Sequence, residues 1–142
     1  MSDSSSEPVF VDTNVLVYAV AYGDARSAAA QSLLRDLVLR EALRTSTQVL
    51  QEFFAVATRK IKLPLTTDRA LEFLDAWAVC PVVLLDCPAI REAAKLSADR
   101  QLSFWDSLIL VAARRSGAKR IYTEDLQHGQ TILGVQVINP FR

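Results

Sequence analysis

Short apolar runs alternate with longer segments of helical periodicity along this chain. The runs at residues 9–11, 82–85, 120–123 and 135–138 are typical of buried strands. The spacing of apolar residues, together with caps and breakers, predicts helices between them. We place these helices at residues 15–21, 25–44, 49–60, 68–78, 88–100 and 104–115, with a very short strand near residue 43. This order predicts an α/β fold with a mainly parallel sheet.

Several residues mark the expected helix ends. Asp12 or Thr13 can cap the first helix, and Thr67 can cap the helix over residues 68–78. The segment 45–48 offers a capping-box start for the helix over residues 49–60. Gly117 follows the last helix at a position where glycine commonly ends helices.

Four acidic residues interrupt elements that are otherwise apolar. Asp12 closes the run 9–11, Asp106 lies inside the apolar helix over residues 104–115, and Asp125 follows the run 120–123, whereas Glu52 borders an apolar helix face. A carboxylate among hydrophobic neighbours must be neutralised, hydrogen-bonded or given a cation. Ligands of parallel sheets bind beyond the carboxyl ends of strands, where Asp12 and Asp125 both lie. The pattern predicts a shared metal site and a metal-dependent hydrolase.

Each acid also has a purely structural interpretation. Asp12 can be a helix cap, Glu52 a solvated helix residue, and Asp125 a turn residue. Asp106 can stand at the third position of a helix capped by Ser103, although its apolar helix face predicts that it points towards the core. Glu124 is an alternative to Asp125. The joint occurrence of all four favours the shared site.

Net charge and the basic and aromatic residues bear on which substrates are compatible with this chain. Sixteen basic residues balance sixteen acidic ones, and without the four candidate ligands twelve acids remain, which leaves an excess of four positive charges. A neutral total therefore does not exclude a polyanionic substrate. The basic clusters at residues 59–62, 114–115 and 119–120 are either solvated helix ends or phosphate contacts. The single histidine, His128, is expected in a surface turn. Both tryptophans, Trp77 and Trp105, are expected in the core, and the alternative is that they are platforms on which bases stack.

Size and cysteine spacing indicate a cytoplasmic globular protein. The 142 residues, 51% of them hydrophobic, predict one domain over residues 9–142 after a flexible tail at residues 1–8 that lacks the features of a secretory signal. No apolar stretch reaches the roughly 18 residues that a membrane span requires. Cys80 and Cys87 bracket a strand and lie roughly 20 Å apart at ~3.3 Å per residue, so they are expected to remain reduced thiols.

An ordered set of short motifs resembles the PIN-domain nucleases, and within them the VapC-type toxins of prokaryotic toxin–antitoxin modules. The motifs are Val11-Asp12-Thr13-Asn14, Gln51-Glu52-Phe53, Phe104-Trp105-Asp106 and Tyr122-Thr123-Glu124-Asp125-Leu126, and the resemblance extends from Val9 to Phe141. It implies a three-layer α/β/α sandwich and a Mg²⁺- or Mn²⁺-dependent endoribonuclease. The family's four-acid site maps onto Asp12, Glu52, Asp106 and Asp125, and its supporting polar positions map onto Asn14 and Thr123.

The resemblance also implies partners. A toxin of this kind acts on RNA, forms a homodimer and is silenced by an antitoxin that lies across the active-site groove. Apolar residues expected to be exposed on the early helices, Leu33, Leu37 and Val38, are candidate contacts for such a partner.

Other functions stay open at this point. A housekeeping PIN nuclease in RNA processing or decay has the same motifs, and a non-catalytic RNA- or protein-binding module can use the same fold. A phosphatase of the haloacid-dehalogenase type needs a second Asp two residues after the first, and that position is Asn14 here.

Overall fold

The computed structural model describes residues 7–142, and within them a six-stranded sheet forms the centre of the molecule. Its strand order is β3-β2-β1-β4-β6-β5, and all neighbours are parallel except β5, which runs antiparallel to β6. The strands are β1 (Val9–Val11), β2 (Leu43–Ser46), β3 (Val82–Val83), β4 (Arg120–Tyr122), β5 (Thr131–Ile132) and β6 (Val135–Ile138). The predicted α/β fold with a mainly parallel sheet is confirmed.

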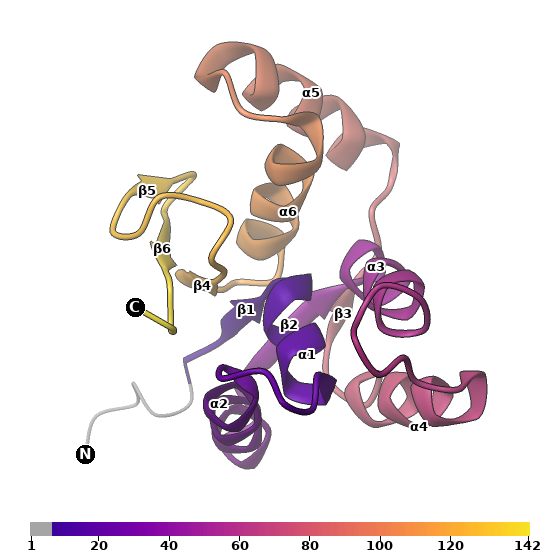
Figure 1. Ribbon diagram of the computed structural model, residues 1–142. Helices are drawn as coiled ribbons and strands as arrows, with labels where there is room; N and C mark the ends of the chain where they lie inside the picture. Colours follow the sequence, from indigo (N-terminus) through magenta and orange to yellow (C-terminus); the bar gives the residue numbers. More distant parts are fainter. Residues whose placement is uncertain (1–6) are drawn as a thin grey trace.

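Helices cover both faces of this sheet (Figure 1). They are α1 (Thr13–Val20), α2 (Ser27–Leu39), α3 (Thr47–Ala57), α4 (Thr67–Trp77), α5 (Cys87–Arg100) and α6 (Phe104–Arg115). The pair α5 and α6 lies on one side, and α1 and α2 pack together on the other, so the architecture is the three-layer sandwich expected from the sequence.

Helix α6 has no solvated face over most of its length. Every residue from Ser107 to Ala113 is buried, because the helix packs against α5 on one side and against β2, β4 and β6 on the other. A helix enclosed in this way is apolar all round, which explains the continuous apolar run in the sequence. The first turn of α6 emerges from this core, and Asp106 lies there.

The predicted end of the second helix was wrong. Helix α2 stops at Leu39 instead of residue 44, because Glu41 adopts the left-handed conformation with φ +56°. The backbone N–H groups of Glu41 and Ala42 then donate to the carbonyls of Val38 and Leu37. These two bonds are the Schellman arrangement that satisfies the last carbonyls of a helix. The same arrangement ends α6, with Gly117 at φ +84° as predicted.

Two smaller predictions also need correction. Thr66 rather than Thr67 caps α4, through a hydrogen bond that its hydroxyl accepts from the Arg69 N–H at 3.2 Å. The strand β5 was not predicted. It forms a hairpin with β6 through Leu133 and Gly134, which both have positive φ angles.

Two expectations about cysteines and membrane spans can be compared with the structure. Cys80 and Cys87 are both free, as predicted. Among the helices in residues 7–142, none is both long and apolar enough to cross a membrane. Most of the predicted N-terminal tail, residues 1–6, lies outside the described residues.

Candidate active site

Asp12 stands at the point where the strand order of the sheet reverses. The strand β1 has β2 on one side and β4 on the other, and Asp12 follows β1 directly as the cap of α1. Its Oδ1 accepts a hydrogen bond from the Thr13 N–H at 2.7 Å, and its Oδ2 accepts one from the Thr123 hydroxyl at 2.9 Å. Thr123 comes directly after β4. The carboxylate thus joins the ends of two neighbouring strands.

Burial makes this carboxylate costly to ionise. Only 5% of Asp12 is exposed, and this burial raises its pKa to about 6. The hydrogen bonds from Thr13 and Thr123 act against that rise, whereas the negative charges of Asp125 and Glu52 add to it. A buried carboxylate beside two further carboxylates is an arrangement that a cation would relieve.

Thr13 connects Glu52 to Asp12, because it donates hydrogen bonds to both carboxylates. The Thr13 hydroxyl donates to Oε1 of Glu52 at 2.8 Å, and the Gln48 amide donates to Oε2 at 3.4 Å. Gln48 and Glu52 lie one turn apart on α3, whose start is fixed by the Ser46 side chain capping the Val49 N–H. Sequence reasoning missed Gln48, and its spacing of four residues from Glu52 is the signal that indicates the pair.

A second set of hydrogen bonds converges on the Thr123 hydroxyl. It accepts from the Asn14 side chain at 3.2 Å and from the Asp125 N–H at 3.1 Å while donating to Asp12. Burial is the main cause that raises the pKa of Asp125, and the charge of Asp106 contributes, against a hydrogen bond from Asn14. The two polar residues expected to support the site, Asn14 and Thr123, therefore link Asp12 to Asp125.

Asp106 enters the site from the first turn of α6. Its backbone N–H donates to the Ser103 side chain at 3.0 Å, so the structure contains the helix cap that the sequence suggested. Its side chain is half-buried rather than directed fully into the core. Asp12 senses the charges of Glu52 and Asp125, and Asp125 senses that of Asp106. The structure thus brings the four predicted acids together as a chain of neighbours.

No basic side chain neutralises this group in the described part of the chain, because none of the four acids takes part in an ion pair there. Glu124, the alternative to Asp125, is held differently. It pairs with Arg26 at 3.2 Å and accepts a hydrogen bond from the Tyr18 hydroxyl. These two partners hold Glu124, whereas Asp125 remains beside the other carboxylates.

The donor set suits a hard cation that keeps part of its water shell. Within residues 7–142, no three His, Cys, Asp or Glu side chains are grouped tightly enough to enclose an ion alone. Mg²⁺ is commonly held by one or two carboxylates together with several waters, so this spacing fits it. The Asn14 Oδ1 atom is buried and accepts no hydrogen bond from the described residues. It is an acceptor for which ion-bound water is a suitable donor.

The basic clusters lie away from the carboxylates. Arg114 and Arg115 are at the far end of α6 from Asp106 and pair with Glu92, and Arg115 also with Asp86. Residues 119–120 stand at the opening of β4, opposite the edge that carries Asp125. Residues 114–115 and 119–120 therefore do not provide phosphate contacts at the four acids.

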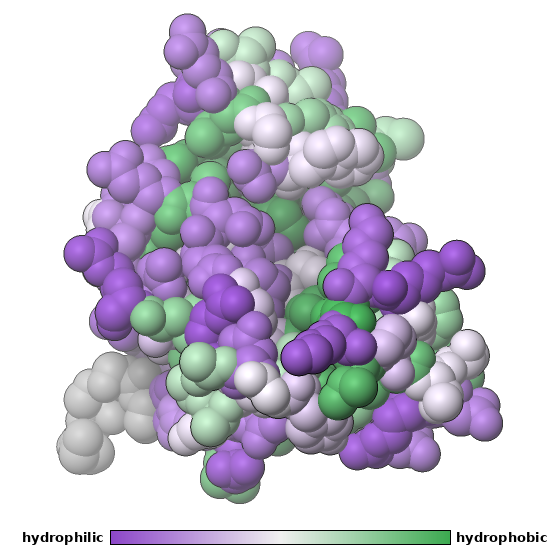
Figure 2. Space-filling view, viewed as in Figure 1, coloured by the Kyte–Doolittle hydropathy of each residue, from purple (hydrophilic) through white to green (hydrophobic). Residues whose placement is uncertain are grey.

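Lys60 and Lys62 lie at a cavity that is separate from the four acids. They line a cavity of about 540 Å³ with the end of α1 and the segment that follows it. Figure 2 shows hydrophobic residues gathered in this region, with hydrophilic side chains around them. The cluster at residues 59–62 thus borders an apolar cavity at the end of α1 distant from Asp12.

The two tryptophans differ. Trp77 is buried, as predicted, and packs against Phe53 and Phe73. The prediction that Trp105 lies in the core was wrong, because 62% of it is exposed. It belongs to the first turn of α6, which projects beyond the packed part of that helix.

Comparison with known families identifies this arrangement. The sequence matches the family model of the PIN domain over residues 9–131, which is most of the chain. The chain belongs to the PIN domain family. None of the curated protein sequences compared with this PIN domain matches it.

Solved structures share the fold. VapC20 of Mycobacterium tuberculosis, described as a Sarcin-Ricin loop cleaving toxin, is 24% identical with a TM-score of 0.65, and the match covers 82% of this chain and 89% of that one. A toxin–antitoxin complex from Klebsiella pneumoniae is 16% identical with a TM-score of 0.68, covering 94% and 98%. VapBC2 from Rickettsia felis, bound to a DNA fragment from its promoter, is 16% identical with a TM-score of 0.64, covering 91% and 96%. At these identities the similarity concerns the fold of this PIN domain.

Proposed function

We propose that this PIN domain is a metal-dependent endoribonuclease and the toxin of a toxin–antitoxin pair. The observation that carries the proposal is the group of four carboxylates around the ends of β1 and β4, which lacks a neutralising cation among the described residues. The negative charges of such groups repel one another, and a bound cation relieves that repulsion. Hydrolysis of a phosphodiester is a reaction that such a site supports.

The residues divide into ligands and supports. Asp12 and Asp106 would be the principal ligands of Mg²⁺ or Mn²⁺, and Glu52 and Asp125 would complete the site or hold waters. Bound there, the ion supplies a Lewis acid that lowers the pKa of water and stabilises charge on the phosphate. Thr13 orients Glu52 through the bond at 2.8 Å, and Thr123 orients Asp12 through the bond at 2.9 Å.

The expected substrate is RNA, cut by activated water. Attack by water on phosphorus leaves a 5′-phosphate and a 3′-hydroxyl, and the neighbouring 2′-hydroxyl takes no part. A carboxylate that holds a water instead of the ion, the role given above to Glu52 and Asp125, can accept the proton that this water loses. Cyclic phosphate products would contradict this mechanism.

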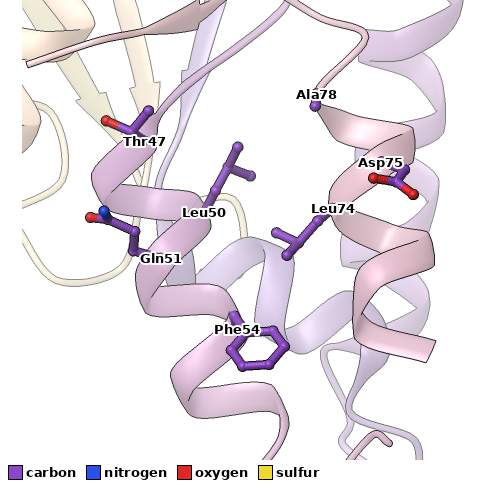
Figure 3. Close-up of a pocket in the computed structure, with 7 residues that line it drawn as sticks. All are labelled: Thr47, Leu50, Gln51, Phe54, Leu74, Asp75 and Ala78. Carbon is purple, nitrogen blue, oxygen red and sulfur yellow. The ribbon is translucent and has the colours of Figure 1, made fainter. Parts of the chain in front are cut away.

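An antitoxin is the expected partner, as in the toxin–antitoxin complexes that share this fold. One expected contact was wrong, because Leu37 is fully buried, whereas Val38 is exposed and Leu33 half-buried. An apolar groove of about 520 Å³ lies elsewhere, between α3 and α4. Leu50 and Leu74 point into it from the two helices (Figure 3). We propose this groove as the seat of an antitoxin segment, and we expect the toxin itself to form a homodimer in the cytoplasm.

The test is cleavage of total cellular RNA by the purified protein, free of antitoxin, with Mg²⁺ or Mn²⁺. We expect discrete fragments with 5′-phosphate ends, which disappear with EDTA and in the Asp12→Asn variant. Asp36→Asn is the matched control, because Asp36 is an exposed acid paired with Arg40 on α2, away from the four acids. Unchanged cleavage by Asp12→Asn, or cleavage that resists EDTA, would refute the metal site.

The housekeeping and binding-module alternatives give different results. A small antitoxin gene beside this gene, whose product stops cleavage, separates a toxin from a nuclease of RNA processing. Folded protein that binds RNA without any metal-dependent cleavage would support the non-catalytic module.

A further inference from the structure

We infer that Trp105 is a stacking platform for an unpaired base of the substrate next to the scissile phosphate. The inference rests on the proposed function and assigns to that site a subsite for a nucleobase. It starts from the contrast between Trp105 and the rest of its helix. Trp105 is 62% exposed, whereas the seven residues from Ser107 to Ala113 are all buried.

The position of Trp105 is fixed relative to the carboxylates from two directions. Asp106 is the next residue of the same helical turn. The side-chain amide nitrogen of Gln48 donates to the Trp105 carbonyl oxygen at 3.5 Å and to the Glu52 carboxylate at 3.4 Å. The reverse orientation of this amide would place its oxygen against two acceptors, so the amide can serve both only in this orientation. One buried side chain thus holds the backbone of Trp105 beside Glu52.

A neighbouring ring supports the indole. Phe104 meets Trp105 edge to face, with ring centroids 5.2 Å apart and an interplanar angle of 77°. Phe104 itself is half-buried and packs against the hydrophobic core. An aromatic side chain braced in this way loses little further freedom when a second ring stacks on it.

Charge explains why the site needs such a contact. The four carboxylates repel an approaching phosphodiester, and the arginines of α6 lie at its other end in ion pairs with Glu92 and Asp86. Base stacking is insensitive to this repulsion because a nucleobase carries no charge, and every base offers a π-face that an indole can cover. Trp105 therefore provides affinity that the charged part of the site does not.

The surroundings of Trp105 favour a base over a protein partner. Gln101 and Ser103, which precede it along the chain, are exposed and polar. A protein interface would present a contiguous apolar patch, whereas a single ring in polar surroundings suits one planar ligand.

The test uses a short oligoribonucleotide that spans the mapped cleavage site, with Trp105→Ala, Trp105→Phe and a matched control. Leu39→Ala is that control, because Leu39 is an apolar residue with 78% exposure at the end of α2. We expect Trp105→Ala to raise KM roughly 5- to 150-fold with kcat nearly unchanged, since stacking holds substrate and transition state alike. Trp105→Phe keeps most of the affinity, and Leu39→Ala behaves as the unaltered protein.

An abasic nucleotide identifies the stacked base. Placed on either side of the scissile bond in turn, it raises KM of the unaltered protein at one position and has no further effect there in Trp105→Ala. An unchanged KM in Trp105→Ala overturns the inference. So does a rise in KM on replacing Trp105 by alanine that is equally large with the intact and with the abasic substrate. So does a change of oligomeric mass that accounts for the rise in KM, which would assign Trp105 to a protein contact. Absence of cleavage by the unaltered protein refutes the proposed function instead.

Discussion

Replacement of Asp12 by asparagine removes a charge that folding transfers from water to the protein interior. The pKa of Asp12 rises from 3.8 to about 6 on folding, mainly because of burial. At ~1.4 kcal/mol for each pKa unit, this rise corresponds to about 3 kcal/mol. The folded state binds the proton of Asp12 more tightly than the unfolded state does. Protonated Asp12 therefore contributes its full share to the free energy of unfolding below about pH 4, and this contribution is lost as the pH rises through about 6.

Asparagine keeps the shape of Asp12 and removes this dependence. It also loses an acceptor for the Thr123 hydroxyl, which costs about 1 kcal/mol. In EDTA we therefore expect Asp12→Asn to be about 2 kcal/mol more stable than the unaltered protein at pH 8. Below pH 4, where Asp12 is protonated in both states, the variant should be about 1 kcal/mol less stable.

Urea denaturation at pH 3 and pH 8 measures both differences, with Asp36→Asn as a control whose exposed ion pair contributes little. The reversal of sign between the two pH values is the decisive result. A variant that is less stable by the same amount at both would show that Asp12 is not a strained charge in the folded protein. The case for a cation site at the end of β1 would then lose its energetic basis.

Three further predictions concern the same site. Mg²⁺ or Mn²⁺ should raise the melting temperature of the unaltered protein at pH 8 and leave that of Asp12→Asn almost unchanged in a thermal shift assay; equal shifts in both would place the ion elsewhere. Thr13→Val, which removes the hydroxyl that donates to Glu52 at 2.8 Å, should lower the cleavage rate about 10- to 100-fold, and a normal rate would deny Thr13 an orienting role. Ser103→Ala removes the cap of the Asp106 N–H and should cost about 1 kcal/mol in urea denaturation, whereas unchanged stability would show that water replaces the cap.

The main elements of the fold could be predicted because their local signals agree with their burial. Gly117 is such a case, since a glycine at the end of an apolar run takes the left-handed conformation freely. Glu41 takes the same conformation at φ +56° although glutamate favours helices, and the sequence therefore predicted a helix that was too long. The hairpin at Leu133 and Gly134 was missed for a similar reason, because leucine is unusual where φ is positive.

The acids of the site could be predicted from the sequence, but the hydrogen bonds that join them could not. Carboxylates next to apolar runs are visible in the sequence, whereas the bonds from Thr13 to Glu52 and from Thr123 to Asp12 join residues 39 and 111 positions apart. Trp105 was misplaced because composition cannot show that the first turn of α6 projects beyond the packed layer. Val38 and Leu37 show the same limit, since adjacent apolar residues of one helix differ completely in exposure.

The pairing of β1 with β4 has a consequence for the order in which the chain matures. Val9 pairs with Arg120 and Val11 with Tyr122, so the strand made first finds this neighbour only after most of the chain has been synthesised. Contacts of such long separation form late in folding. During translation the N-terminal half can emerge and begin to collapse while Asp125 is still inside the ribosome. The end of β1 that carries Asp12 therefore meets the end of β4 only after residues 120–122 have left the ribosome.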